Sequence, residues 1–205
     1  MVSFSDYEMI SNLRIEDEFL KSYLNYKKRP SYSLVLARDK AKIIQKLNKT
    51  ELRLSYPIYF EEYINEYANK NNVNPYLIIS IIKQESHFDS TAKSGAGAYG
   101  LMQIIMDTAR FIEKENLIES RISEPKYNIY LGTKYLKYLK DLFNGVELYA
   151  VLSYNAGPGN VKKWLKENKT NDIDIFIETI PFKETRDYVK NIYQNYLNYS
   201  MYENF

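Results

Sequence analysis

One glutamate stands out by its position in a helical sequence pattern. In the stretch PYLIISIIKQES, the spacing i, i+3, i+4, i+7 puts Glu85 on the same helix face as Ile78, Ile81 and Ile82. A carboxylate on an apolar face is costly unless it is neutral or lies at the edge of a cleft. Desolvation would raise its pKa and keep it protonated near neutrality, as a general acid requires. The same spacing fits a glutamate that reaches water from a frayed helix end, so both interpretations stay open.

Most of the seven glycines fall in two loops, SGAGAYGLMQ at 94–103 and SYNAGPGN at 153–160. Glycine suits positions where the backbone turns tightly or approaches another group closely. A single loop of this kind is explained by a helix end. Two such loops in a helical protein, each with polar side chains, indicate a cleft lined by backbone amides. The polar side chains are Ser94, Gln103, Tyr154 and Asn155.

The segment GAGAYG at 95–100 also matches the G-x-G-x-x-G spacing of a dinucleotide-binding turn. That motif requires a strand that runs directly into the glycines and a helix that opens from them. Twelve residues, KQESHFDSTAKS, separate the apolar run LIISII from Gly95, and no second strand follows. The sequence therefore predicts no nicotinamide or flavin site.

The composition excludes several other kinds of chemistry. The absence of cysteine excludes disulfides, thiol catalysis and cysteine metal sites, and the single histidine, His87, argues against a histidine metal cluster. His87 faces away from the apolar stripe and is expected to be a surface or capping residue. The formal net charge of +2 gives no electrostatic argument for a nucleic-acid partner. We therefore expect no cofactor and no metal.

The elements that must position these residues are predicted to be almost entirely helical, so the fold class is all-α. Apolar residues recur at three- and four-residue spacings in most of the chain, and Asn74-Pro75 is typical of a helix N-cap followed by proline. Short runs such as DIDIFIE at 172–178 are the only candidate strands. The expected helices cover 6–27, 33–49, a segment after Pro57, 75–88, 125–143, 147–155, 161–168 and 184–199.

Three segments resemble the signatures of the soluble lytic transglycosylase catalytic domain, which is goose-lysozyme-like. ESHFDSTAKSGAGAYGLMQIIMDTAR is similar to the first signature, SYNAGPGNVKKW to the second and IPFKETRDYVKNIY to the third. They occur in the family's order over roughly residues 55–200. Departures at Ser90, Ile105-Met106 and Ser153 concern loop shape and groove lining, and so bear on substrate preference rather than on the acid.

The resemblance implies a lysozyme-like helical catalytic domain over residues 53–205. Residues 1–52 would form a helical N-terminal extension, either the end of a helical superhelix region or an extension of its own. Trp164, in VKKWL, lies on an apolar helical face and is expected to belong to the core.

The resemblance further implies an enzyme that cleaves the MurNAc-GlcNAc bond of peptidoglycan without water. The C6 hydroxyl of the muramic residue attacks its own anomeric carbon and leaves a 1,6-anhydro end, with Glu85 as general acid and then base. An ordinary glycosidase needs two carboxylates beside the bond. The candidates for a second carboxylate are Asp89, which fits a loop residue, and Glu184, which fits a helix start.

Other site residues follow only from the resemblance. Ser94 and Gln103 would hydrogen-bond substrate, Tyr154 would support Glu85 or the oxocarbenium-like centre, and Asn155 would shape the same wall. A purely structural alternative for Tyr154 and Asn155 is a helix C-cap. In the third signature, the structural alternative is an internal ion pair between Arg186 and Glu184. The residues that would join that signature to the groove are Glu184, Arg186 and Tyr188.

Two alternatives remain beside the transglycosylase, namely a hydrolytic muramidase on the same fold and a catalytically silent peptidoglycan-binding module. The expected partners are peptidoglycan glycan strands, with no nucleic acid and no membrane span, and a monomer is expected. The first residues, MVSFSDYEMISNLRIEDEFL, do not have the pattern of a signal peptide. Because the substrate lies outside the cytoplasmic membrane, we expect a periplasmic or otherwise exported protein.

Overall fold

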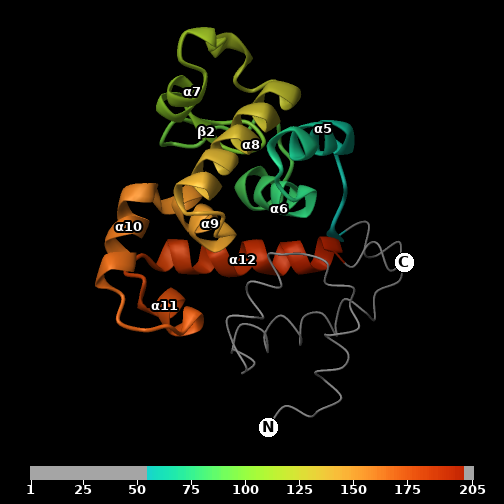
Figure 1. Ribbon diagram of the computed structural model, residues 1–205. Helices are drawn as coiled ribbons and strands as arrows, with labels where there is room; N and C mark the ends of the chain where they lie inside the picture. The colour runs from blue at the N-terminus through green and yellow to red at the C-terminus, as the bar shows by residue number, and fades with distance from the viewer. Residues whose placement is uncertain (1–54, 201–205) are drawn as a thin grey trace.

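The computed structural model describes residues 55–200, which form a helical domain (Figure 1). The helices expected at 6–27 and 33–49, and the proposed extension 1–52, lie outside the described residues. The elements in chain order are α5 (Glu61–Asn71), α6 (Pro75–Ser86), β1 (Ala98–Tyr99), β2 (Ile104–Ile105), α7 (Met106–Glu113), η1 (Lys114–Asn116), η2 (Glu119–Arg121), α8 (Pro125–Leu142), α9 (Glu147–Ala156), α10 (Pro158–Glu167), α11 (Ile173–Thr179) and α12 (Lys183–Ser200).

The all-α prediction is confirmed, with two corrections. Residues 172–178 are not a strand, because the carboxylate of Asp172 accepts hydrogen bonds from the backbone N–H groups of Asp174 and Ile175 and so starts helix α11. The other correction is a small antiparallel hairpin of β1 and β2, which pairs Ala98 with Ile105. Each strand is only two residues long, too short to show an alternating pattern.

Helix α6 is the central element of the domain. It begins as predicted, since the side chain of Asn74 accepts a hydrogen bond from the N–H of Tyr76 at 2.8 Å and Pro75 takes the first helical position. Its apolar residues are buried on nearly all sides, among them Leu77 and Ile79, which lie off the face that the sequence singled out. A helix that is apolar all round belongs in a core. The long helix α12 packs along it, and α5 also contacts it (Figure 1).

The buried side chain of Asn128 on α8 holds the glycine-rich hairpin in place. Its amide oxygen accepts the N–H of Met102 at 2.7 Å, and its amide nitrogen donates to the carbonyls of Tyr99 and Ile122 at 2.8 and 2.7 Å. Asn128 is fully buried, so these bonds replace those it would make with water. One side chain thereby fixes both the hairpin and the segment before α8.

The remaining features agree with a single packed core. Trp164 on α10 is buried, which confirms its predicted core position. Within residues 55–200, no helix combines the length and the apolar character that a membrane crossing requires.

Two glycines of the hairpin provide a test of this arrangement. Gly97 and Gly100 both have positive φ, +78° and +71°, but only at Gly100 would a Cβ meet Asn128, whose Nδ2 lies 2.6 Å from the Cβ position. We expect Gly97→Ala to cost about 1 kcal/mol, from backbone strain alone. Gly100→Ala should cost about 1–3 kcal/mol more, because Asn128 is held by three hydrogen bonds and cannot move freely. Urea denaturation measures both, and equal losses would contradict the role given to Asn128.

Candidate active site

Glu85 lies in the last turn of α6, against α12. The hydroxyl of Tyr188 on α12 donates a hydrogen bond to its Oε1 at 2.7 Å, across 103 residues of chain. Helix α6 ends at the next residue, Ser86. The C-cap residue His87 takes a left-handed backbone conformation, and its N–H bonds to the carbonyl of Lys83. His87 is exposed, as the sequence analysis expected. The side chain of Glu85 is half-buried, and its carboxyl group is bonded to α12 and does not extend freely into solvent from the helix end.

Burial raises the pKa of Glu85 to about 7. Desolvation is the main cause, because it penalises the charged carboxylate. The hydrogen bond from Tyr188 acts in the opposite direction, and the negative charge of Glu184 adds to the rise. A carboxyl group with this pKa exists in both protonation states near neutrality, so it can donate a proton and then accept one.

Two tyrosines lie next to this carboxyl group. The charge of Glu85 contributes to a raised pKa at both Tyr154 and Tyr188, after the larger contribution from burial. Their hydroxyls do different things, since that of Tyr154 donates to the carbonyl of Met102 at 2.9 Å. Tyr154 thus ties α9 to the loop that follows the glycines and faces Glu85 without a direct hydrogen bond.

The structure places Ser94 and Gln103 within the glycine-rich loop, where their hydrogen bonds shape the loop itself. The hydroxyl of Ser94 accepts the N–H of Ala98 at 3.0 Å. The amide nitrogen of Gln103 donates to the carbonyls of Gly100 and Ala92 at 2.9 and 3.2 Å. Both side chains are half-buried, so part of each still faces the outside of the loop.

Asn155 joins α9 to the start of α12. Its side-chain oxygen accepts a hydrogen bond from the hydroxyl of Thr185 at 2.6 Å. The guanidinium of Arg186 donates to the carbonyl of Ile180, and residues 55–200 contain no ion pair between Arg186 and Glu184. The internal Arg–Glu pair considered from the sequence is therefore not formed. Glu184 is exposed in the first turn of α12 and acts on Glu85 through its charge.

Asp89 has the structural role that the sequence suggested. Its carboxylate accepts hydrogen bonds from the N–H and the hydroxyl of Thr91, at 2.8 and 2.7 Å, and these bonds lower its pKa. The carboxylate is committed to a turn in an exposed loop. Of the two conceivable second carboxylates, only Glu184 acts on Glu85.

Two residues that organise the site were not among the predicted site residues. Ser86 donates to the carbonyl of Leu101 at 2.9 Å and so connects the end of α6 to the glycine-rich loop. Asn128 holds the same loop from α8. A signal was present for Asn128, since it shares the apolar face of its helix with Leu131 and Leu136, where an amide needs buried partners. No group of His, Cys, Asp or Glu side chains suited to a metal ion is present among residues 55–200.

Comparison with known proteins identifies the family of this chain. The family described as Transglycosylase SLT domain matches residues 62–177. The soluble lytic murein transglycosylase of Salmonella typhimurium is 38% identical over 144 residues, which cover 67% of this chain and 22% of that protein. The Escherichia coli K12 protein of the same name is 36% identical over 71% of this chain and 24% of its own length. The chain thus spans under a quarter of the length of these relatives.

Solved structures give the same result. An inactive mutant of the lytic transglycosylase Slt from Pseudomonas aeruginosa superposes with a TM-score of 0.71 at 32% identity, covering 84% of this chain and 30% of that one. The 70 kDa soluble lytic transglycosylase from Escherichia coli gives a TM-score of 0.68 at 30% identity, over 87% of this chain and 31% of that one. These matches confirm the predicted lysozyme-like helical fold. The chain belongs to the Transglycosylase SLT domain family.

Proposed function

We propose that this domain is a peptidoglycan lytic transglycosylase. It cleaves the β-1,4 bond between MurNAc and GlcNAc without water and leaves 1,6-anhydroMurNAc ends. The observation that carries the proposal is the desolvated, half-buried carboxyl group of Glu85, whose pKa of about 7 suits one residue to act as both acid and base. Membership of the family and the names of the relatives support the same activity.

The proton moves twice in the proposed mechanism. Protonated Glu85 first donates its proton to the glycosidic oxygen as the bond to the GlcNAc residue breaks. The N-acetyl carbonyl of the muramic residue shields the positive charge that develops at the anomeric carbon. The resulting carboxylate, which Tyr188 stabilises by its hydrogen bond, then takes the proton of the C6 hydroxyl as that oxygen bonds to the anomeric carbon. No water is consumed, and Glu85 ends protonated.

The walls around Glu85 would hold the strand. Ser94 and Gln103 come from the glycine-rich loop, Asn155 from the end of α9, and Glu184 from the start of α12. Tyr188 would position the carboxyl group through its hydrogen bond, and Tyr154, close enough to feel the charge of Glu85, would support it from α9. We propose that these residues bind substrate or position Glu85 and that the domain needs no cofactor.

A hydrolytic muramidase is the second candidate, and the position of Glu184 favours it. Its charge reaches Glu85, so a water held by Glu184 would give the second carboxylate that hydrolysis requires. We place this candidate second because Glu184 is exposed in the first turn of α12. By either reaction the substrate is peptidoglycan, so we propose a monomeric protein that acts in the periplasm or after export.

Product analysis tests the proposal directly. Wild type and Glu85→Gln are incubated with purified peptidoglycan, and the soluble products are identified by mass spectrometry. We expect anhydro-muramic ends from the wild type and a loss of at least about a hundredfold in rate from the variant, because the proton donor is gone. Reducing ends would support the muramidase instead. Binding without any product would leave the silent binding module.

The pH profile should respond in opposite directions to two substitutions. The hydrogen bond from Tyr188 lowers the pKa of Glu85, so Tyr188→Phe should raise that pKa and move the alkaline limb of kcat/KM to higher pH. The charge of Glu184 raises it, so Glu184→Gln should move the limb to lower pH. Measuring kcat/KM at a series of pH values across the alkaline limb gives the direction of each shift. Shifts in the same direction would contradict the proposed acid.

The stability of the fold should also depend on Glu85. Its pKa is about 7 in the folded protein and about 4.5 when the chain is unfolded, so the folded state binds the proton more tightly and the free energy of unfolding falls as pH rises between these values. Glu85→Gln removes this penalty and keeps an oxygen for Tyr188. The free energy of unfolding of the variant should equal that of the wild type below pH 4. Above pH 7 it should exceed the wild-type value by an amount on the order of 3 kcal/mol.

Urea titrations at a series of pH values measure this gain. Glu167→Gln, at an exposed carboxylate on α10, serves as the control and should show no trend of this kind. A pH-independent difference between Glu85→Gln and wild type would show that Glu85 is not desolvated in solution.

A further inference from the structure

The first turn of α12 is attached to α9 through one buried threonine. Lys183 and Glu184 at the start of α12 are exposed and Arg186 is half-buried, whereas Thr185 is only 1% exposed. Its hydroxyl donates a hydrogen bond to the side-chain oxygen of Asn155 on α9 at 2.6 Å. The two helices pack against each other (Figure 1). The bond therefore joins the end of α9 to the start of α12.

Both tyrosines beside the candidate acid lie within one helical turn of this bond. Tyr154 directly precedes Asn155 on α9. Tyr188 follows Thr185 on α12 at the i, i+3 spacing, so the two buried side chains share one face of the helix. The charge of Tyr154 adds to the raised pKa of Tyr188, after the larger contributions from burial and from Glu85, so the two hydroxyls are close to each other. A displacement at Thr185 would therefore move the hydroxyl of Tyr188.

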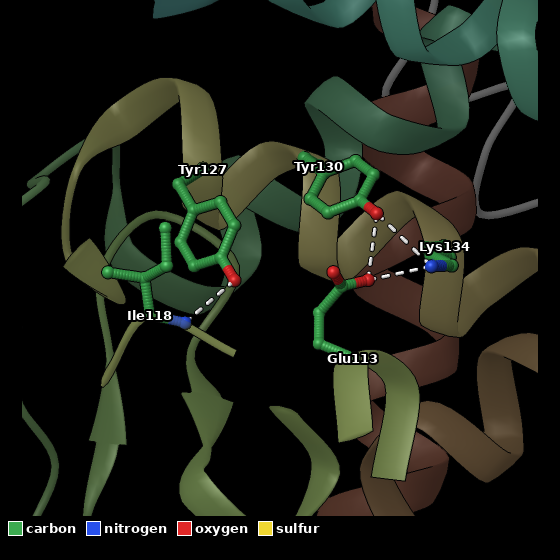
Figure 2. Close-up of polar contacts among 5 residues, drawn as sticks. All are labelled: Glu113, Ile118, Tyr127, Tyr130 and Lys134. Carbon is green, nitrogen blue, oxygen red and sulfur yellow. Dashed lines mark hydrogen bonds and ion pairs between the residues drawn. The ribbon is translucent and has the colours of Figure 1, made fainter. Parts of the chain in front are cut away.

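A second carboxylate in the domain shows why the position of this hydroxyl matters. Glu113 on α7 accepts a hydrogen bond from the hydroxyl of Tyr130 at 2.7 Å and another from the ammonium group of Lys134 at 2.6 Å (Figure 2). There a cation compensates for the charge. Within residues 55–200, Tyr188 is the only donor to the carboxyl group of Glu85, and no cation pairs with that group. The carboxylate form of Glu85 thus depends on one neutral donor.

This donor is sensitive to motion of the helix turn that carries it. A hydrogen bond weakens steeply as its length and angle depart from the optimum. The hydroxyl of Tyr188 lies at the far end of a stiff ring, so a small rotation of the turn displaces the hydroxyl more than the backbone. Helix ends have unsatisfied backbone groups and are held less firmly than helix interiors. The bond from Thr185 restrains the turn that precedes Tyr188.

Two other titratable groups face Glu85. Glu184 lies in the same turn of α12 and raises the pKa of Glu85 by its charge, and Tyr154 on α9 responds to the charge of Glu85. Glu184 is exposed, so solvent screens its charge and a small displacement changes its effect little. The hydroxyl of Tyr154 is held by the carbonyl of Met102. The contact with Tyr188 is therefore the one that a loosened first turn of α12 would change most.

We propose that Thr185 is a positioning residue for the reaction, because its hydrogen bond to Asn155 holds Tyr188 where the hydroxyl can donate to Glu85. The inference rests on the proposed function, in which Glu85 gives up its proton and then takes one back. Without the bond, the first turn of α12 gains freedom, the hydrogen bond from Tyr188 weakens, and the carboxylate is less stable. The pKa of Glu85 then rises.

The test measures the pKa of Glu85 without substrate. The protein is isotope-labelled at the glutamate carboxyl carbons, and the resonance of Glu85, assigned by its loss in Glu85→Gln, is followed by NMR as the pH is varied. Thr185→Val removes the hydroxyl and keeps the volume, Thr185→Ser keeps the hydroxyl, and Asn155→Ala removes the acceptor of the same bond. Circular dichroism checks the fold of each variant, and Asn155→Ala provides the same test if Thr185→Val does not fold.

We expect Thr185→Val and Asn155→Ala to raise the pKa of Glu85 by about half a unit, because the hydrogen bond to the carboxylate weakens without being lost. Thr185→Ser should leave it unchanged. The matched control is Thr133→Val, at a fully buried threonine on α8 whose hydroxyl has no hydrogen-bond partner in the described part of the chain, and it should cause no shift. An unchanged pKa in Thr185→Val and Asn155→Ala would overturn the proposal, and so would a lower one, which would mean that water enters the site.

A double substitution shows whether Thr185 acts through Tyr188. Tyr188→Phe removes the donor and should by itself raise the pKa of Glu85 by about one unit or more. In that background, Thr185→Val should add nothing, because no hydroxyl is left to be displaced. An equal rise in both backgrounds would show that Thr185 acts on Glu85 by another route, and the positioning role would then be wrong.

Products from purified peptidoglycan separate this proposal from the proposed function. If the wild type forms no anhydro-muramic ends, the proposed reaction fails, while the pKa values still decide the role of Thr185. If anhydro ends form but Thr185→Val leaves the pKa of Glu85 at the wild-type value, the reaction stands and the positioning role falls. Where both are correct, the alkaline limb of kcat/KM moves to higher pH in Thr185→Val and stays in place in Thr185→Ser.

Discussion

The burial of one carboxyl group is the constraint on which the rest of the domain depends. Glu85 lies in the last turn of α6, a helix so apolar that it must lie in the core, and its side chain is half-buried. Desolvation there raises the pKa to about 7, and a hydrogen bond from Tyr188 offsets part of the cost. The long contact between α6 and α12 therefore both packs the core and supplies the partner of the carboxyl group.

The glycine-rich loop is fixed by hydrogen bonds to its backbone. Ser86 holds the carbonyl of Leu101, Tyr154 that of Met102, and Asn128 both the N–H of Met102 and the carbonyl of Tyr99. These side chains come from α6, α9 and α8. A loop rich in glycine has much conformational freedom to lose. Anchoring it from three helices keeps the glycine-rich loop at a set position relative to α6, which carries Glu85.

The electrostatics of the site are a balance among few groups. The hydrogen bond from Tyr188 lowers the pKa of Glu85 and the charge of Glu184 raises it, while desolvation by burial raises it more than either group changes it. Because Glu184 is exposed, solvent screens its effect, whereas the contact with Tyr188 lies in the interior. Such a balance lets a single residue serve as acid and base, and it makes the pKa sensitive to any change in access of water.

The sequence alone determined the features that local rules control. The Asn74 cap, the extents of α8 and α9, the burial of Trp164 and the placement of Glu85 on an apolar face follow from spacing and residue type within a few turns. The hairpin was missed because its strands are very short, and α11 because one side chain, Asp172, decides the helix. The short helix α7 was also not among the expected helices.

Only the tertiary structure decided which side chains form hydrogen bonds with Glu85 and with the glycine-rich loop. Tyr188 lies 103 residues from Glu85, and the roles of Asn128 and Ser86 appear only when α8 and α6 meet the loop. The hydrogen bonds of Ser94 and Gln103 turned out to close the loop itself. The physical reason is that desolvation and hydrogen-bond pairing depend on which distant segments pack together, and residue spacing along the chain does not contain that information.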